Sequence, residues 1–545
     1  MRQRFALIRH SIQATVFYLA PRLSTVILFI LVSWHFGPKD AGIYTLGVTF
    51  LLILNVVTRG IDDLIVRECA QPSQDATHLF VRFGLLRLLL VLFFYVLLLI
   101  SIKVGFRYGS EASNFIILMA LVAFPEAIIA TCQSIFVGLQ NFKKPSQVIG
   151  ATNFIKLVLG AAVILSTGTL ALLAWSAVAS YVAGAIFMLT SLRSHLNVVS
   201  QKCPIPYLQK LRRNKAFLDK VRWIGSRWPT RSKFTQDLRQ SLPFMAITGL
   251  VGTEGQLDII LLSIFQSEQA VGWYGAATTI TSSFAILSQA YRQSVYPVMS
   301  QYVANVLRPN IQSTQIRSDI SSNSTILPSD LGKPVRENIS SDVYLKKLNH
   351  LYESSILYLG LLSFPIAAGT ILIAPTIVPA LFGNAFGPTI TIVQILAIGI
   401  PFGFLNVPNS RLMFAYNAQR YLLLFVAIAF VLNIGLNFLL TPFLSSNGAA
   451  LARVISMVVL CLSSHSYVRY TILHRSVWKQ IIAPLIASGI MITVLLPLRS
   501  AGLFVVFVAG VLVYGLVIWL MRAVPREDLR GLYDAFARKF TWHRN

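Results

Sequence analysis

Ionisable side chains lie inside several long apolar stretches of this chain. Arg22, Lys156 and Arg292 stand well within such stretches, Glu126 stands in the middle of another, and Arg453 begins one. A charge at the centre of a bilayer costs at least about 2.5–3.5 kcal/mol, so such a group usually faces a partner or a cavity. Arginine suits phosphate because its planar guanidinium remains protonated. We predict that Arg22, Lys156 and Arg292 line an anion-holding cavity. The alternative is that these cations form structural ion pairs. Arg453 stands at the start of its stretch, so its side chain is able to extend to the outer surface.

Two carboxylates accompany these cations. Glu254 and Asp258 are four residues apart and therefore share one face of a helix. An unpaired carboxylate at membrane depth tends to stay protonated, whereas a nearby arginine keeps it ionised. We predict that at least one of them pairs with Arg22 or Arg292 in one conformational state. The alternative is that Asp258 only fixes the packing of its helix.

A second acidic pair lies near the end of an apolar stretch. Asp62 and Asp63 stand between Arg59 and Arg67. Because cations flank them so closely, we interpret these carboxylates as a salt-bridge cluster. A site for a coupling ion is the alternative interpretation.

The apolar stretches are long enough to cross a membrane. A helix of about 20 apolar residues spans a hydrocarbon core of about 30 Å. Hydrophobic residues make up 55% of the chain, charged residues 12%, and the mean hydropathy is +0.68. The sequence therefore predicts an all-α polytopic membrane protein. Its fourteen predicted spans are about 13–33, 41–58, 83–104, 114–138, 149–167, 170–192, 242–265, 270–299, 354–382, 388–411, 421–444, 448–470, 480–497 and 501–521.

The distribution of Lys and Arg predicts how the chain is threaded. With both termini in the cytoplasm, about 38 of the 46 Lys and Arg residues lie on the inner side and about 4 lie outside. The net charge of +26 is thereby explained by topology, and no nucleic-acid partner is needed. The first apolar run is full length and lacks a cleavage pattern, so we interpret it as a retained helix and expect a multi-pass protein of the cytoplasmic membrane.

Long separators divide the chain. Residues 193–241 are rich in cations and predict a cytoplasmic linker. A compatible interpretation is an amphipathic helix within this segment that binds anionic lipids. Residues 303–343 are rich in Ser and Asn and predict a flexible cytoplasmic loop. The predicted organisation is an N-terminal lobe at 1–192, the linker, a C-terminal lobe at 242–475, and two further helices with a cytoplasmic tail at 476–545.

The two lobes share short motifs. The second predicted span begins Asp-Ala-Gly-Ile-Tyr around Gly42, and the eighth begins Ala-Val-Gly-Trp-Tyr around Gly272. The sixth and twelfth begin with related sequences at Gly168 and Gly448. Six spans separate the members of each pair, so corresponding helices run in the same direction. This predicts parallel six-helix repeats around a central cavity, an arrangement known in secondary transporters.

Several kinds of chemistry are excluded. No Walker-type, HExxH or GxSxG motif stands in a plausible context, so we expect no catalytic site, no ATP hydrolysis and no cofactor. The four cysteines are scattered and form no CxxC pair. We therefore interpret them as buried free thiols and expect no metal site.

Three stretches resemble the polysaccharide transporter, or oligosaccharide flippase, family of the multidrug/oligosaccharidyl-lipid/polysaccharide exporter superfamily. One runs from Ser241-Leu242-Pro243-Phe244 through Leu257-Asp258-Ile259-Ile260 to Gly272-Trp273-Tyr274. Another covers Phe36-Gly37 to Tyr44. The third contains Asn433-Ile434-Gly435-Leu436-Asn437 and Asn447-Gly448-Ala449. The resemblance covers the first twelve spans, and the long loops at 193–241 and 303–343 depart from the family pattern.

The resemblance implies a function. It implies alternating access and a polyprenyl-pyrophosphate-linked oligosaccharide as the substrate, moved from the inner to the outer leaflet for cell-surface polysaccharide biosynthesis. Polysaccharide polymerases and glycosyltransferases are the implied partners. One alternative is a cation-coupled multidrug exporter, whose cavity is expected to be acidic or aromatic. Another is a membrane glycosyltransferase or polymerase, for which the outer loops are short.

Overall fold

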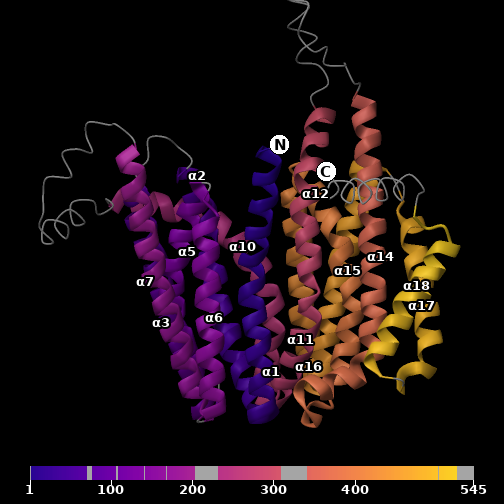
Figure 1. Ribbon diagram of the computed structural model, residues 1–545, viewed down its shortest axis with the longest axis horizontal. Helices are drawn as coiled ribbons and strands as arrows, with labels where there is room; N and C mark the ends of the chain where they lie inside the picture. The colour runs from indigo at the N-terminus through magenta and orange to yellow at the C-terminus, as the bar shows by residue number, and fades with distance from the viewer. Residues whose placement is uncertain are drawn as a thin grey trace, which may run out of the picture. The chain divides into compact units, whose positions relative to one another are not determined.

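The computed structural model describes residues 2–69, 76–105, 108–139, 141–166, 168–202, 231–307, 341–474, 476–500 and 502–524. All regular elements in these residues are helices, as predicted (Figure 1). Helices satisfy their own backbone groups, which a chain in hydrocarbon requires. The elements are α1 (Arg2–Thr58), α2 (Gly60–Cys69), α3 (Ala76–Val104), α4 (Ser110–Ala120), α5 (Ala123–Gly138), α6 (Lys143–Ser166), α7 (Leu170–Lys202), α10 (Arg231–Phe265), α11 (Glu268–Ser283), α12 (Ala285–Leu307), α14 (Ser341–Phe382), η1 (Asn384–Phe386), α15 (Thr389–Ala415), α16 (Gln419–Tyr467), η2 (Val468–Leu473), α17 (Trp478–Leu495), η3 (Pro497–Ser500) and α18 (Leu503–Leu520).

Two of the longest helices are each two predicted spans joined at a kink. In α1 the break lies at Gly37, whose φ of 82° suits a residue without a Cβ, and Pro38 follows it. In α16 the break lies at Ser445, with a φ of 51°. Both breaks fall between the predicted spans.

Ten helices in the described residues are long and apolar enough to cross a membrane, and two of these contain the kinked pairs. The predicted seventh span lies in α10, and the predicted eighth is divided at Phe284 into α11 and α12. The count of fourteen spans stays a prediction. The separator at 193–241 is helical up to Lys202 and again from Arg231, and its amphipathic segment lies outside the described residues.

The chain forms two compact units. The first contains 1–283 with the segments 378–392 and 430–453, and the second contains 284–377, 393–429 and 454–545. These units do not coincide with the predicted lobes, because the seventh span, α11 and short segments of α14, α15 and α16 belong to the first unit. The division into lobes stays a prediction.

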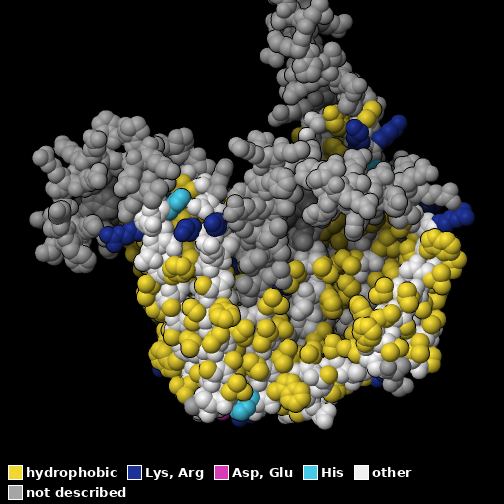
Figure 2. Space-filling model, in the orientation of Figure 1, with side chains coloured by type: hydrophobic (Ala, Val, Ile, Leu, Met, Phe, Trp, Pro, Cys, Tyr) yellow, Lys and Arg dark blue, Asp and Glu magenta, His cyan; other side chains and the backbone are white. Residues whose placement is uncertain are grey.

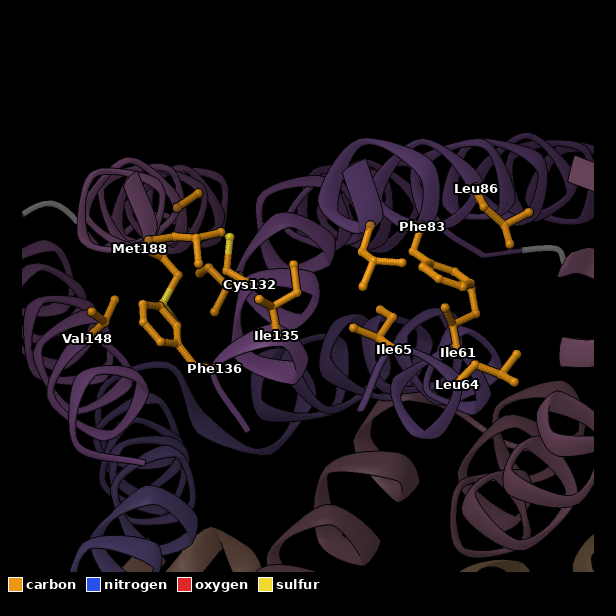
Figure 3. Close-up of a cluster of buried hydrophobic side chains, with 14 of the residues drawn as sticks. Ile61, Leu64, Ile65, Phe83, Leu86, Cys132, Ile135, Phe136, Val148 and Met188 are labelled. Carbon is orange, nitrogen blue, oxygen red and sulfur yellow. The ribbon is translucent and has the colours of Figure 1, made fainter. Parts of the chain in front are cut away.

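The first unit has a core between α2, α3, α5 and α7. Figure 3 shows Phe83 close to Ile61 at one end of this cluster, and Met188 close to Phe136 at the other. Cys132 is fully buried there as a free thiol. Helix α1 packs against α4, α6, α10 and α11 of the same unit, and so it borders every site described below in that unit.

The second unit has its own cores. Tyr352 of α14, Leu412 of α15 and Cys461 of α16 belong to the largest of them, together with Met299 of α12. A smaller cluster joins α12, α14 and α15, with Tyr291 packed against it. Helices α12 and α15 are thereby held side by side, which matters for the arginines that they carry.

Large apolar side chains cover the outside of both units. The side chains visible over α3, α6 and α7 are mostly hydrophobic, as are those visible over α17 and α18 (Figure 2). Phe93 of α3 and Phe504 and Trp519 of α18 are 59%, 79% and 71% exposed. Apolar exposure on this scale fits contact with lipid and identifies a multi-pass membrane protein.

The two motif glycines meet in the first unit, where α1 crosses α11. A Cβ added at Gly42 would collide with the carbonyl oxygen of Glu268, and one added at Gly272 would collide with the carbonyl oxygen of Pro38. Each carbonyl belongs to the residue four positions before the partner glycine, so the contact is reciprocal. The repeat motifs inferred from the sequence therefore face each other in equivalent ways.

Candidate functional site

Two arginines of the second unit lie close together. Arg411 of α15 contacts Tyr296 of α12, which stands one helical turn after Arg292 and therefore on the same face. The guanidinium carbon of Arg411 lies 5.6 Å from the ring centroid of Tyr296 and 5.1 Å from that of Phe414. These rings orient the guanidinium group and attract its charge, but they do not neutralise it.

The arginine pair lacks a counter-charge within the described chain. The Nε atoms of Arg292 and Arg411 are buried without a hydrogen-bond acceptor there. No ion pair joins either arginine to a described carboxylate. Two unpaired cations at close range are unfavourable unless an anion binds between them, so this arrangement is suited to a group with several negative oxygens.

Arg22 belongs to the first unit. Its Nη1 donates a hydrogen bond to the carbonyl oxygen of Ser282, at 2.8 Å, near the end of α11. One contact of this kind leaves most of its five donors free to bind an anion. The predicted role of Arg22 as a cavity cation stays a prediction.

Lys156 lines a partly open pocket inside the first unit. The pocket has a volume of about 150 Å³ and lies between α1, α4, α5, α6 and α7. Its charged lining residues are Arg59, Glu126 and Lys156, and Tyr44 and Tyr181 also face it. This pocket brings together Lys156 and Glu126, which lie in different apolar stretches of the sequence.

The charged groups of this pocket bind uncharged neighbours. The Nδ2 of Asn55 donates to a carboxylate oxygen of Glu126 at 2.6 Å, and the Nζ of Lys156 donates to the hydroxyl of Thr25 at 3.3 Å. Neither Lys156 nor Arg59 forms an ion pair with Glu126, although all of these side chains are described. The pocket therefore separates charges that water or a ligand must bridge.

Asp258 is the centre of a buried network in the first unit. It is fully buried and forms an ion pair with the Nη1 of Arg453 at 3.3 Å. It also accepts hydrogen bonds from Asn433 at 2.9 Å, Asn437 at 3.1 Å and the hydroxyl of Tyr274 at 3.1 Å. The guanidinium group of Arg453 also donates to the carbonyl oxygen of Gly255, at 3.0 Å. That Arg453 reaches the outer surface stays a prediction.

The predicted partners of Asp258 are therefore replaced, in this structure, by Arg453. Its pairing with Arg22 or Arg292 in another state stays a prediction. The side chain of Glu254 lies outside the described residues. In this conformation four partners hold the buried carboxylate of Asp258 in place.

Asp62 and Asp63 follow shortly after the end of α1, and the structure describes the side chain of Asp62. Asp62 forms an ion pair with Arg87 and accepts a hydrogen bond from Ser134 at 2.8 Å. Arg87 is fully buried and comes from α3 rather than from the flanking cations. The side chains of Asp63 and Arg67 lie outside the described residues.

Sequence reasoning missed two of these cations. Arg411 stands at the last position of the predicted span 388–411, where an arginine indicates an inner boundary. Arg87 follows only a few residues after the start of 83–104 and carries the same ambiguity. In both cases the available signal was a single arginine inside the apolar run, as for Arg22.

The sequence matches a family model. The model described as "Polysaccharide biosynthesis protein" matches residues 7–303, which is more than half of the chain. A search of the curated proteins found no match. The matched residues include two of the three stretches that carry the resemblance, among them the span pattern around Asp258.

Solved structures share the fold. The lipid II flippase MurJ in an inward closed conformation is 13% identical, with a TM-score of 0.63, over 93% of this chain and 98% of its own. An inward-facing multidrug resistance transporter of the MATE family is 15% identical, with a TM-score of 0.58, over 83% and 94%. A superfamily transporter from Pyrococcus furiosus is 15% identical, with a TM-score of 0.51, over 86% and 96%. At these identities the likeness shows the fold, which is that of the predicted superfamily.

Proposed function

The chain belongs to the polysaccharide biosynthesis protein family, and we propose on this basis that it is a flippase for a polyprenyl-pyrophosphate-linked oligosaccharide. It moves this lipid from the inner to the outer leaflet of the cytoplasmic membrane by alternating access, and it supplies cell-surface polysaccharide biosynthesis. The observation that carries the proposal is the pair Arg292 and Arg411, because neither forms an ion pair with a described carboxylate.

A pyrophosphate fits this pair for chemical reasons. It carries several negative oxygens on two adjacent phosphorus atoms, and two guanidinium groups are able to bind them at the same time. Arg22 and Lys156 are the further cations that we assign to substrate binding, Arg22 to the pyrophosphate and Lys156 to another part of the substrate. The lipid tail remains in the bilayer, so only the headgroup and sugars need a polar path.

The carboxylates are assigned to conformational coupling. We propose that Asp258, Glu254, Asp62 and Asp63 form ion pairs that change between states of the transport cycle. A ligand shifts such an equilibrium only through its different affinity for the two states. Competition between the pyrophosphate and a carboxylate for one arginine would supply that difference.

The membrane context follows the charge distribution. Both termini and the two long loops are proposed to face the cytoplasm, where their cations contact anionic lipids. Polysaccharide polymerases and glycosyltransferases are the proposed partners, since they consume and supply the lipid-linked oligosaccharide. No catalytic step is assigned to the chain itself.

The fold does not choose between a flippase and a multidrug exporter. The solved structures with this fold include a lipid II flippase and a multidrug resistance transporter. An exporter of cationic drugs is repelled by unpaired cations, and this chain has Arg292 and Arg411 beside the rings of Tyr296 and Phe414. The arginine pair therefore favours an anionic substrate.

Loss of the protein tests this function. We expect a deletion strain to accumulate one lipid-linked oligosaccharide on the inner leaflet, and the wild-type gene to clear it. Arg292→Ala and Arg411→Ala are expected to lower flipping about 10- to 100-fold, the equivalent of one charged hydrogen bond. Arg420→Ala, at an exposed position of the same unit, is the matched control. Full complementation by both pair variants, or no accumulation after deletion, would overturn the proposal.

A further inference from the structure

The pocket around Lys156 is built entirely from the first unit, whereas Arg292 and Arg411 belong to the second. We propose that this pocket binds a single carboxylate group. The carboxylate comes either from an acidic sugar unit of the transported oligosaccharide, which rests on the proposed function, or from a free small acid, which does not.

The lining presents more donors than acceptors. Lys156 has three N–H donors, of which Thr25 accepts one, and Arg59 has five. The hydroxyl groups of Tyr44 and Tyr181 have no hydrogen-bond partner among the described residues, so they are also free to donate. A ligand that satisfies this lining must be rich in acceptors, and a carboxylate offers two oxygens with about four lone pairs.

The charge of the lining indicates a monoanion. Two cations, Arg59 and Lys156, face one carboxylate, Glu126, so a single negative charge on the ligand makes the pocket neutral. A phosphate monoester would place a second negative charge near Glu126, where no further cation lines the pocket. Glu126 accepts a hydrogen bond from Asn55 at 2.6 Å, and it forms no ion pair with Lys156 in the described residues.

The size of the pocket limits the ligand to one small unit. An engineered apolar cavity of about 150 Å³ in another protein admits a single six-membered ring, that of benzene. The pocket here has a similar volume, about 150 Å³, and its walls carry polar groups. One carboxylate with part of the ring that carries it fits this space, whereas a disaccharide does not.

Binding of a carboxylate to the purified full-length protein tests the proposal. Glucuronate is the probe, and glucose, which has the same ring without the acid, is the control ligand. We expect glucuronate to bind by calorimetry and to raise the melting temperature, because a ligand stabilises the folded state that binds it. Glucose is expected to do neither at the same concentration. Equal effects of the two sugars would overturn the proposal.

Variants of the lining sharpen the test. Lys156→Leu is expected to weaken glucuronate binding about tenfold or more, and Lys156→Arg to retain most of it. Lys144→Leu places the same substitution at an exposed position of α6 and is expected to bind as the wild type does. Unchanged binding by Lys156→Leu would overturn the assignment.

A second variant is expected to strengthen glucuronate binding. Glu126→Gln removes the repelling carboxylate and is expected to tighten glucuronate binding about three- to fivefold. If Lys156→Leu does not fold, this variant still decides the matter, because a role in packing alone predicts no gain. Weaker or unchanged binding by Glu126→Gln would contradict the proposal.

Flipping assays identify the source of the carboxylate. If Lys156→Leu lowers flipping of an acidic lipid-linked oligosaccharide but not of a neutral one, the ligand is the substrate's acidic sugar. If glucuronate binding is lost while both lipids are flipped normally, the ligand is a free acid. Failure of the wild-type protein to flip either lipid would overturn the proposed function and leave the measured binding standing.

Discussion

Two regions of the first unit correspond through the repeat and can be compared position by position. The offset between Gly42 and Gly272 is 230 residues, and it aligns the first two spans with the seventh and eighth. The offset between Gly168 and Gly448 is 280 residues, and it aligns the fifth and sixth spans with the eleventh and twelfth. The region around the Lys156 pocket and the region around Asp258 are equivalent under these offsets.

The residues at equivalent positions differ sharply in chemistry. Three residues that line the pocket have counterparts in the buried network: Leu28 with Asp258, Tyr44 with Tyr274, and Leu173 with Arg453. Leu28 and Leu173 both lie against Gly160, so they are neighbours, as Asp258 and Arg453 are. One repeat thus has two leucines beside an open pocket where the other has an ion pair.

The asparagines show what the two regions keep in common. Asn153 accepts a hydrogen bond from Ser24 at 3.2 Å, and its counterpart Asn433 donates to Asp258 at 2.9 Å. The first bond joins the fifth predicted span to the first, and the second joins the eleventh span to the seventh, which are the corresponding spans of the other repeat. The comparison indicates that the helix arrangement is shared, and that the side chains decide whether the space between the helices is open or filled.

The largest effect is expected from breaking the Asp258–Arg453 pair. Arg453→Leu leaves a buried carboxylate without its cation and is expected to cost about 3–5 kcal/mol of stability. Asp258→Leu combined with Arg453→Leu introduces the residues of the other repeat and should recover most of that loss. Melting temperatures of the purified variants measure both effects. A double variant no better than Arg453→Leu would show that the two regions are not interchangeable.

The glycine crossing tests whether the repeats are structurally equivalent. Gly42→Ala and Gly272→Ala each force a Cβ against a backbone carbonyl, and overpacking of this kind costs about 1–3 kcal/mol. Because the contact is reciprocal, we expect the two losses of stability to be similar. Gly249→Ala, where a Cβ meets nothing within 4 Å, is the matched control. A large loss at one glycine and none at the other would contradict the equivalence.

We expect Asn433→Ala to cost more stability than Asn153→Ala. Asn433→Ala removes a hydrogen bond to a carboxylate, worth about 1.5–3 kcal/mol, whereas Asn153→Ala removes one between neutral groups, worth about 1 kcal/mol. Thermal unfolding of the two variants under identical conditions measures the difference. Equal losses would mean that Asp258 gains little from Asn433 beyond its other partners.

The smallest effect concerns Glu268, which precedes the second motif. Its partial burial raises the pKa of the carboxyl group, Lys39 opposes this, and Glu111 and Asp40 add to it. A raised pKa means that stability is present at low pH and is lost as the pH rises through the folded-state value. Glu268→Gln should therefore stabilise the protein by less than about 1 kcal/mol near pH 7 and have no effect near pH 4. If Glu268→Gln stabilised the protein more at pH 4 than at pH 7, the pKa of Glu268 would not be raised in the folded state.

Hydropathy predicted the helices well because each apolar run must find lipid or a partner helix. The turn at Gly37 was predicted because glycine and proline mark it, whereas the break at Phe284 has no such signal in its apolar run. The partner of Asp258 was not predicted. Spacing along the chain does not tell which helices pack together, and Arg453 is almost two hundred residues away.

The charged pocket was missed for a related reason. Lys156 and Glu126 were both noticed in the sequence, but they are brought together only by the packing of α5, α6 and α1. Arg411 is the last residue of a predicted span, where an arginine usually indicates the membrane boundary. The sequence therefore did not predict that it lies near Arg292. Pairwise distances between helices are needed to find sites of this kind.

The reciprocal contact of Gly42 and Gly272 bears on how far two repeats can diverge. It consists of backbone atoms and of an absence, the missing Cβ, so it demands no particular side chain from the residues around it. Substitutions can accumulate on both helices without disturbing it. A contact of this kind between two repeats therefore outlasts nearly all sequence identity between them.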